Sequence, residues 1–376
     1  MDKKINLKKI LNEEFFEPPV SRFKSLRIAK KFNFFNVKHE IKSPGIFVCN
    51  KTTLFDKALV SSALCGNFVF LKNDIISQIH NNSLSAKQKT ALLKEIKELF
   101  KQGISVVVFP EKNYSIFGEC EKLPQSVTEF LFETGLDLKY FYLIGTYFVW
   151  PIWSKNPRKC ETRYSQQFKL ENYELAEKSI ERRNEIINNM MPSSASTYAQ
   201  KFPVSIKGGA LAENIDTLMF CCPKCKSFFS VYSEFNCLKC RNCGSFLEFS
   251  NDGKIMFSNE IESFDAIEPF LFKSLKNYEF SMKPIVCYNN IHFQKNDEIG
   301  KPVTIKNVEM EIYADKFILI VGDKTKHFLI SDIKEFLFGH NNTLFVKAKK
   351  EEFSLHGENK ENFFILIQLL KLYNSN

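Results

Sequence analysis

Residues 45–56, GIFVCNKTTLFD, decide how the N-terminal half of this chain folds. The short apolar run at 46–49 is typical of a buried strand, and it leads into a polar turn at 50–53. We expect a helix to begin at Leu54, with Asp56 in its first turn. A strand that passes through a polar turn into a helix N-terminus is a common way to place reactive side chains on an α/β sheet.

Outward from this stretch, strand and helix patterns alternate along the chain. Buried strands are predicted at 46–50, 68–71, 104–109 and 140–144, and helices at 54–65, 84–102 and 126–134. This alternation is typical of a domain with a largely parallel sheet. We therefore expect an α/β domain over residues 44–200, preceded by a basic, amphipathic N-terminal arm at 1–43.

Two polar motifs in this region follow predicted strands. The first contains Asn50, Lys51 and Asp56, and the second is the stretch 107–115, VVFPEKNYS. Their order and spacing resemble the glycerophosphate/lysophosphatidate acyltransferase superfamily. The first motif of that family reads Asn-His, four residues, Asp, so Lys51 stands where the family has its histidine.

The second motif resembles the family's phosphate-binding loop, Phe-Pro-Glu-Gly-Thr-Arg-Ser. Four positions match and three differ: Phe109, Pro110, Glu111 and Ser115 are the family's residues, whereas Lys112, Asn113 and Tyr114 replace its glycine, threonine and arginine. The loss of the arginine removes a bidentate contact with phosphate that a lysine does not reproduce. The stretches 68–74 and 142–153 lie where the family has further motifs, so the resemblance covers residues 40–165.

The resemblance implies transfer of an acyl chain to a lysophosphatidate-type acceptor at a membrane surface, with acyl-CoA or acyl carrier protein as the donor. It places Lys51 and Asp56 at the reaction centre. It places the acceptor beside four polar residues: Asn50, Glu111, Lys112 and Ser115. In the family, the histidine takes the proton of the acceptor hydroxyl, a task that suits a neutral imidazole near pH 7.

Lys51 does not suit that task in an obvious way. A free lysine has a pKa of about 10.4, and a neighbouring Asp56 would raise it, so we expect an ion pair between Lys51 and Asp56. His39 or His80 could supply the missing base by folding into the site. Asp56 also completes a capping box with Thr53, which explains it without catalysis. The alternative is therefore a catalytically inactive, lipid- or protein-binding member of the same fold.

Six of the eleven cysteines are bunched at residues 221–243. We expect four of them to hold one structural zinc ion as two Cys-x₂-Cys pairs: Cys222, Cys225, Cys240 and Cys243. Four thiolates suit a closed tetrahedral Zn²⁺ site, and the aromatic strands between the pairs indicate a zinc ribbon at 218–249. Cys237 could replace Cys240, but Gly244 eases the turn of the preferred set.

The C-terminal third changes to a strand pattern. Residues 250–304 read as a connecting segment, with a helix at 266–277 followed by irregular polar chain. Strands are predicted within a domain at 305–376, followed by a helix at 362–373; the strands are 308–313, 317–321, 327–330, 344–347 and 352–355. Strands closed by one C-terminal helix resemble a pleckstrin-homology or GRAM-like barrel, which implies lipid or peptide docking. A plain α+β domain without a ligand stays an open alternative.

Composition narrows the partners further. The 376 residues carry a net charge of +9, which suits an anionic membrane surface, an anionic substrate or nucleic acid. The predicted ribbon lacks a stripe of basic and aromatic residues, so nucleic acid is the least favoured of these. The chain shows neither a signal peptide nor an apolar run of about 18 residues. We expect a cytoplasmic protein, with peripheral attachment to a membrane as an open alternative.

Overall fold

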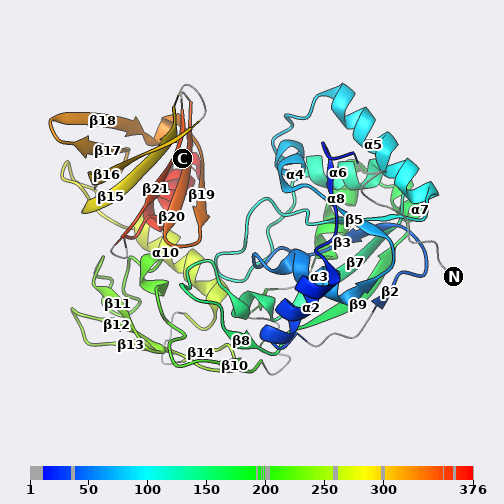
Figure 1. The fold of residues 1–376 in the computed structure, drawn as a ribbon. Helices are drawn as coiled ribbons and strands as arrows, with labels where there is room; N and C mark the ends of the chain where they lie inside the picture. The colour runs from blue at the N-terminus through cyan, green and yellow to red at the C-terminus, as the bar shows by residue number, and fades with distance from the viewer. Residues whose placement is uncertain are drawn as a thin grey trace. The chain divides into compact units, whose positions relative to one another are not determined.

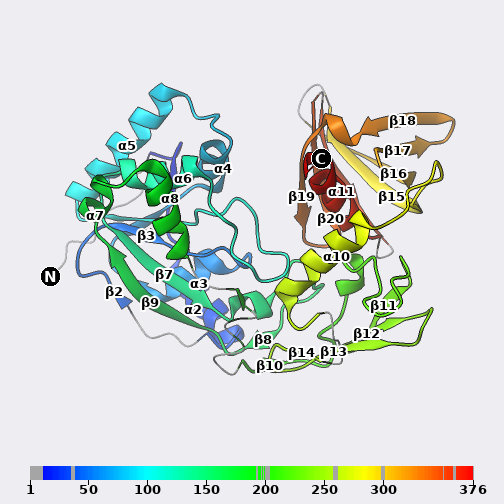
Figure 2. The ribbon, with the colours of Figure 1, turned by 180° about the vertical axis from the view of Figure 1, so that it is seen from behind.

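The computed structural model describes residues 12–34, 39–191, 194, 195, 197, 199, 204–256, 261–297, 301–349, 351–358 and 361–375. The chain divides into two compact units, which are visible in Figures 1 and 2. Unit 1 consists of Met1–Trp150 and Arg158–Lys207, and unit 2 of Pro151–Pro157 and Gly208–Asn376. The two acyltransferase-like motifs lie in unit 1, and the paired cysteines lie in unit 2.

A six-stranded sheet with the order β1-β5-β6-β3-β7-β9 forms the centre of unit 1. Its strands are β1 (Phe16–Glu17), β3 (Ile46–Val48), β5 (Phe68–Leu71), β6 (Ser105–Val108), β7 (Leu138–Ile144) and β9 (Arg163–Leu170). The four inner strands run parallel to one another, whereas β1 and β9 are antiparallel to their neighbours. The largely parallel sheet predicted from the alternating pattern is therefore present, and it has an antiparallel strand at each edge.

Helices cover both faces of this sheet because its inner strands are apolar on both sides. Ile46 and Val48 belong to a core with α4, α5, α6 and α8, whereas Phe47 and Cys49 belong to a core with α2 and α3. These helices are α2 (Arg22–Lys31), α3 (Asp56–Ala63), α4 (Asn73–His80), α5 (Ala86–Lys101), α6 (Gln125–Glu133) and α8 (Ile180–Asn189). Figure 2 shows the two groups of helices on opposite sides of the sheet.

Short elements complete unit 1. β2 (His39–Glu40) pairs with β4 (Leu64–Cys65), and β8 (Lys159–Cys160) pairs with β10 (Ile206–Lys207). A 3₁₀ turn, η1 (Thr146–Val149), follows β7, and α7 (Asn172–Ala176) follows β9. Neither α4 nor β9 was predicted from the sequence. α4 does carry apolar residues at helical spacing, Ile75, Ile76 and Ile79, and this signal was overlooked.

The cysteine-rich part of unit 2 forms an antiparallel sheet with the order β11-β12-β13-β14. Its strands are β11 (Val231–Glu234), β12 (Cys237–Cys240), β13 (Phe246–Phe249) and β14 (Ile255–Met256), flanked by the short turns η2 (Ile215–Thr217) and η3 (Phe264–Ala266). The helix α10 (Ile267–Lys276) follows and buries Ile267, Leu271 and Leu275 along one side. It packs against the C-terminal helix α11 (Phe364–Ser375), where Gln368 donates a hydrogen bond to Glu268.

The rest of unit 2 is one seven-stranded antiparallel sheet with the order β18-β17-β16-β15-β21-β20-β19. Its strands are β15 (Val286–Asn296), β16 (Pro302–Ile312), β17 (Lys316–Val321), β18 (Lys324–Leu329), β19 (Ile333–Gly339), β20 (Thr343–Ala348) and β21 (Glu352–His356), with η4 (Ile330–Asp332) before β19. The Phe317 ring of β17 lies 6.2 Å from that of Phe336 on β19, although these strands are far apart in the strand order. The sheet therefore curls around a phenylalanine core. Because β18 and β19 are its edge strands among the described residues, the curled sheet is a half-barrel, and the predicted pleckstrin-homology or GRAM-like barrel is confirmed only in this coarser form.

Two strands of this sheet were missed at the sequence level. β15 lies in the segment expected to be irregular, and only Ile291 and Phe293 are buried along it. An irregularity in its pairing with β16 between Tyr288 and Ile291 breaks the alternation of apolar and polar side chains. A similar shift after Ile333 hides the pattern of β19. Local breaks in register therefore removed the period of two on which strand prediction depends.

Candidate functional site

Asn50 joins the end of β3 to the neighbouring strand β7. Its side-chain nitrogen donates to the backbone oxygen of Leu143 at 3.0 Å, and its Oδ1 accepts from the backbone N–H of Leu143 at 2.7 Å. The side chain is buried, with Asn50 only 4% exposed. Asn50 thus extends the sheet ladder by one pair of hydrogen bonds and sets the position of the turn. Its expected contact with a substrate remains a prediction.

The carboxylate of Asp56 closes the turn onto itself. One oxygen accepts from the backbone N–H groups of Thr52 at 2.5 Å and Thr53 at 2.8 Å, and the other accepts from the Thr52 hydroxyl at 3.2 Å. The bond from the Thr53 N–H to Asp56 is one half of the predicted capping box; the other half is not formed, because the Thr53 hydroxyl accepts from the N–H of Phe55 at 3.4 Å and not from that of Asp56. Burial raises the pKa of Asp56 to about 7, although the bonds from Thr53 and Thr52 act in the opposite direction.

Lys51 points from this turn into the second motif. Its Nζ donates to the backbone oxygen of Lys112 at 2.8 Å and lies 4.7 Å from the centre of the Tyr114 ring. Lys51 is 7% exposed. Burial lowers its pKa from the ordinary value, while the nearby carboxyl groups of Glu111 and Asp56 raise it. The expected ion pair with Asp56 is wrong for the described structure, because the Asp56 oxygens are occupied by the turn.

Glu111 connects the two motifs through its carboxyl group. One oxygen accepts a hydrogen bond from the backbone N–H of Lys51, and the other accepts from the backbone N–H of Glu121 at 3.1 Å. Glu111 is 1% exposed, and this burial raises its pKa to about 8 against the effect of both hydrogen bonds. Much of the Glu111 population therefore carries a proton near neutral pH. The side chain braces the site and brings no full negative charge to it.

The remaining predicted residues lie on the same loop. Nζ of Lys112 donates to Oδ1 of Asn81 at 3.1 Å, and its backbone N–H donates to Glu121 at 2.8 Å. The Ser115 hydroxyl is buried and has no hydrogen-bond partner among the residues that the structure describes. A buried hydroxyl without a partner is uncommon, so it marks a place where a bound group could donate or accept.

The two candidate histidines lie in different places. Nε2 of His80, at the end of α4, is 2.7 Å from the backbone oxygen of Pro110 and so contacts the second motif directly. His39 instead packs its ring near Phe47 and Phe141. His80 therefore adjoins the loop that holds Lys51, a contact that chain distance alone could not reveal.

Three contributors to the site were not recognised as such in the sequence. Tyr114 lies in the second motif, and Nζ of Lys51 is 4.7 Å from the centre of its ring. Glu121 receives the N–H groups of Lys112 and Asn113 and so shapes the loop. Thr146 places its hydroxyl 2.6 Å from that of Thr52. No sequence signal marks the last two, because they act through tertiary contacts.

A second candidate site lies in unit 2, where four cysteines come together. The Sγ atoms of Cys222, Cys225, Cys240 and Cys243 all lie within 4.8 Å of one another. The distance from Cys222 to Cys243 is 3.8 Å and that from Cys225 to Cys240 is 3.7 Å. Tetrahedral zinc with Zn–S bonds of about 2.3 Å requires S···S distances of about 3.8 Å, so this donor set fits the ion.

The local structure explains this convergence. Each Cys-x₂-Cys pair forms a tight turn: the N–H of Lys226 bonds to Cys222 O, and that of Gly244 bonds to Cys240 O. Gly244 has φ of +68°, as a glycine easily adopts. Among the described residues, Cys221 and Cys237 lie outside the four-sulfur cluster, as predicted. The four cysteines can therefore hold a metal ion.

Comparison with known proteins gives partial likenesses only. No protein-family profile matches the chain, and no curated protein matches it by sequence. By structure, it is similar to the 1-acyl-sn-glycerophosphate (LPA) acyltransferase PlsC from Thermotoga maritima, at 17% identity and a TM-score of 0.33, over 49% of this chain and 77% of that one.

Two further structural similarities are weaker. Inner Membrane Complex Sub-compartment Protein 3 from Toxoplasma gondii gives 11% identity and a TM-score of 0.18, over 22% of this chain and 75% of that one. The N-terminal PH domain of human ARAP2 gives 10% identity and a TM-score of 0.20, over 26% of this chain and 88% of that one. These likenesses assign no substrate, partner or activity to this chain.

Proposed function

We propose that unit 1 is an acyltransferase that moves an acyl chain from acyl-CoA or acyl carrier protein to a lysophosphatidate-type acceptor. One observation carries the proposal: the two motifs that resemble that superfamily meet at one buried amine. The turn at 50–56 supplies Lys51, and the loop at 110–115 holds its Nζ through the Lys112 carbonyl and the Tyr114 ring.

Lys51 would act as the base in place of the family's histidine. A neutral amine has two N–H donors, which the Lys112 carbonyl and the Tyr114 ring can accept, and one lone pair that remains for a proton. Burial favours this neutral form. The amine would take the proton of the acceptor hydroxyl while that oxygen attacks the thioester carbonyl. The C–S bond then breaks, and the proton passes from Lys51 to the leaving thiolate.

The acceptor's phosphate would lie on the second motif. Lys112 supplies a positive charge there, though not the bidentate fork of an arginine. The unpartnered Ser115 hydroxyl supplies a hydrogen bond. These two contacts suit the phosphate of lysophosphatidate, and they suit a neutral glyceride less well.

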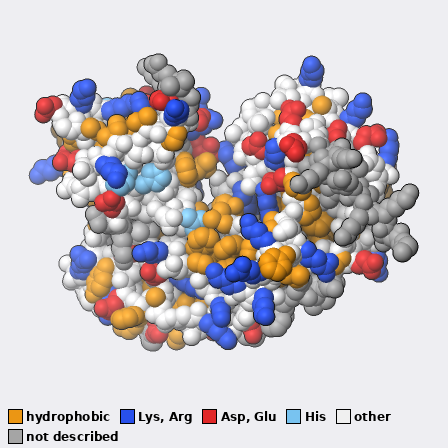
Figure 3. Space-filling model, in the orientation of Figure 1, with side chains coloured by type: hydrophobic (Ala, Val, Ile, Leu, Met, Phe, Trp, Pro, Cys, Tyr) orange, Lys and Arg blue, Asp and Glu red, His pale blue; other side chains and the backbone are white. Residues whose placement is uncertain are grey.

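Contact with a membrane would come through α2. This helix contains five basic residues and no acidic one, and two of its apolar residues face solvent: Phe23 is 79% exposed and Leu26 is 38% exposed. Leu54, 49% exposed, lies two residues before the adjacent α3. Figure 3 shows hydrophobic and basic side chains interspersed over the region of α2 and α3. A basic face with exposed apolar residues suits an anionic bilayer surface.

No helix in the described part of the chain is long and apolar enough to cross a bilayer. Sedimentation with vesicles tests the surface attachment. The protein should bind vesicles that contain phosphatidylserine, and Phe23→Asp should weaken this binding. Equal binding by the variant and the parent would contradict a membrane role for α2.

A second candidate function is lipid binding without turnover. It is favoured by Asp56, which bonds to the turn and not to Lys51. In the family, that aspartate orients the base, so its absence from Lys51 leaves the base unsupported. A charged, protonated Lys51 would also interact favourably with the Lys112 carbonyl and the Tyr114 ring face, and in that form it could not accept a proton.

One assay separates the two candidates. Transfer of a labelled acyl chain from acyl-CoA to lysophosphatidate is measured for the natural protein, Lys51→Met and Lys51→His. Acyl transfer by a Lys51 base predicts activity in the natural protein that Lys51→Met abolishes. Lys57→Met is the matched control, because Lys57 lies on α3 and pairs with Glu17.

The other outcomes are equally informative. If Lys51→Met keeps acyl-transfer activity, Lys51 is not the base. His80, which contacts the backbone oxygen of Pro110, is then the next candidate for the base. If the natural protein shows no acyl transfer and Lys51→His does, the site lacks only its base. If neither the natural protein nor Lys51→His transfers the acyl chain, but the natural protein binds lysophosphatidate, the lipid-binding function is supported.

We also propose that the four-cysteine cluster holds Zn²⁺ in a structural role. The ion would have four thiolate ligands and no open position, which leaves no place for a substrate. Metal analysis of the purified protein should give about one zinc per chain. Cys240→Ser should lose the metal, whereas Cys237→Ser, outside the cluster, should keep it. Loss of zinc in both variants or in neither would contradict this assignment.

A further inference from the structure

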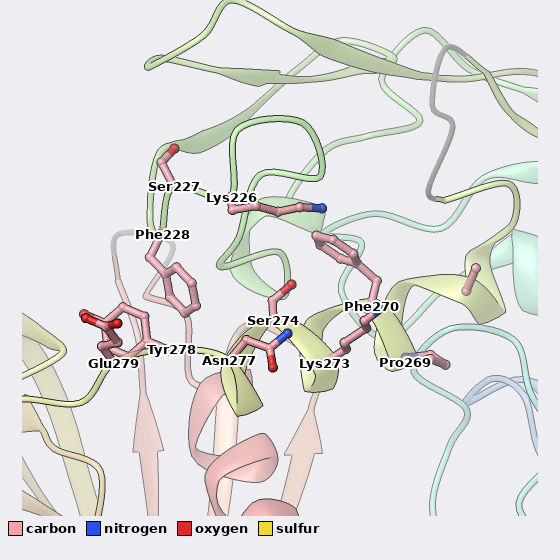
Figure 4. A pocket seen from close by; sticks show the side chains of 11 residues that line it. Lys226, Ser227, Phe228, Pro269, Phe270, Lys273, Ser274, Asn277, Tyr278 and Glu279 are labelled. Atoms are coloured by element: carbon pink, nitrogen blue, oxygen red, sulfur yellow. The ribbon is translucent and has the colours of Figure 1, made fainter.

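A large pocket lies within unit 2, between the first cysteine turn and α10. Figure 4 shows Lys226, Ser227 and Phe228 on one side of it, and α10 with the residues that follow it, 277–279, on the other. Its volume is about 1220 Å³. Pockets for small ligands measure about 300–1000 Å³, so this space exceeds the needs of a single side chain.

The α10 side of the pocket presents polar groups that nothing else uses. The side chains of Lys273, Ser274 and Asn277 form no hydrogen bond or ion pair within the described parts of the chain. Figure 4 shows the Ser274 hydroxyl and the Asn277 amide directed toward the opposite wall. A hydroxyl and an amide so placed can pair with the N–H and C=O groups of an extended peptide.

The aromatic residues of the pocket are already engaged with neighbours. The Tyr278 ring lies 4.4 Å from that of Phe228 and 5.3 Å from that of Phe280. The Phe270 ring has Nζ of Lys226 4.8 Å from its centre. Binding of single-stranded nucleic acid depends on open ring faces on which bases stack. Because neighbouring groups cover part of these rings, fewer ring faces remain for stacking, and the apolar ring surface suits an aliphatic side chain.

Charge differs between the two ends of the pocket. Nζ of Lys226 lies over the Phe270 ring, and Lys273 lines the pocket about one helical turn further along α10. At the Tyr278 end, Glu279 and the C-terminal carbonyls of α10 present negative charge. This arrangement opposes a uniformly anionic chain such as nucleic acid. It suits a ligand with a carboxylate at one end and N–H donors at the other.

We propose that this pocket binds a short acidic segment of a partner protein. An acidic side chain lies beside Lys226 and Lys273, an aliphatic side chain packs against the apolar ring surface, and the segment's backbone bonds to Ser274 and Asn277. The ligand class follows from the lining residues of unit 2 alone, so it does not depend on acyl transfer by unit 1.

A display library of random heptapeptides, selected on the full-length protein, tests this proposal. Enriched peptides should share an Asp or Glu and a Leu, Ile or Val. Their affinity is then measured by fluorescence polarisation with synthetic labelled copies. Lys273→Glu should weaken binding about tenfold or more. Lys276→Glu should have little effect, because Lys276 lies in the same last turn of α10 but does not line the pocket.

A charge exchange sharpens the test. Replacing the acidic residue of the selected peptide by lysine should restore much of the binding to Lys273→Glu. Equal losses in the two lysine variants, or selection of peptides without acidic residues, would overturn the proposal. A labelled oligouridine serves as the nucleic-acid probe. If it binds tightly and Lys273→Glu abolishes that binding, the ligand is nucleic acid and the peptide proposal is overturned.

Discussion

Glu111 should make the stability of unit 1 fall as the pH rises toward 8. Burial is the largest cause that raises its pKa from 4.5 to about 8 in the folded protein. The unfolded chain loses this proton near pH 4.5, so between the two values the folded state binds more protons than the unfolded state. Stability from this group is therefore fully present below the unfolded pKa and decreases through the window above it.

The magnitude follows from the two pKa values. Between about pH 5 and pH 8 the unfolded carboxyl ionises almost completely, while the folded one reaches half ionisation. At about 1.4 kcal/mol per pH unit, the free energy of unfolding should fall by roughly 3 kcal/mol. Glu111→Gln removes this dependence, because an amide does not titrate. The substitution also places an amide N–H group opposite the backbone N–H of Lys51 or Glu121. The loss of that hydrogen bond should lower the free energy of unfolding by about 1–3 kcal/mol.

Urea unfolding at several pH values provides the measurement. The chain has two tryptophans, and a Trp153→Phe background leaves Trp150 as the reporter in unit 1, where it stacks on Phe55 at 5.2 Å. Glu111→Gln should be less stable than this parent near pH 5 and should close the gap near pH 8. Asp56, with a pKa of about 7, leaves a smaller slope in both proteins. Parallel curves for the two proteins would refute the reasoning.

Three further predictions concern the fold and the metal. Asn50→Ala should lower the free energy of unfolding by about 2–4 kcal/mol, because it leaves both backbone groups of Leu143 unpaired in the core; a change below about 1 kcal/mol in urea unfolding would contradict its bracing role. Phe317→Ala should lower the stability of unit 2 by about 3–5 kcal/mol in thermal unfolding, and the half-exposed Phe345→Ala should not. Chelation of the metal should increase tryptic cleavage after Arg241, as mass spectrometry can show, and unchanged cleavage would count against a structural metal.

The sequence by itself determined the order of the main elements of unit 1. Its inner strands are buried on both faces, so they appear as uninterrupted apolar runs such as Val106–Val108. The four cysteines whose sulfurs cluster were also identified in advance, because each pair is local and its spacing fixes the turn. The strands β15 and β19 were missed, since breaks in register hid their alternation.

The chemistry of the site was decided only by the tertiary structure. Only four residues separate Lys51 from Asp56 in the chain, yet Nζ of Lys51 contacts Lys112 and Tyr114, far along the sequence. The carboxylate of Asp56 instead accepts hydrogen bonds from the backbone N–H groups of Thr52 and Thr53, because buried backbone donors at a helix start require an acceptor. Sequence spacing shows which side chains are near one another along the chain. Only the packing of β3 beside β6 shows which loop each of them meets.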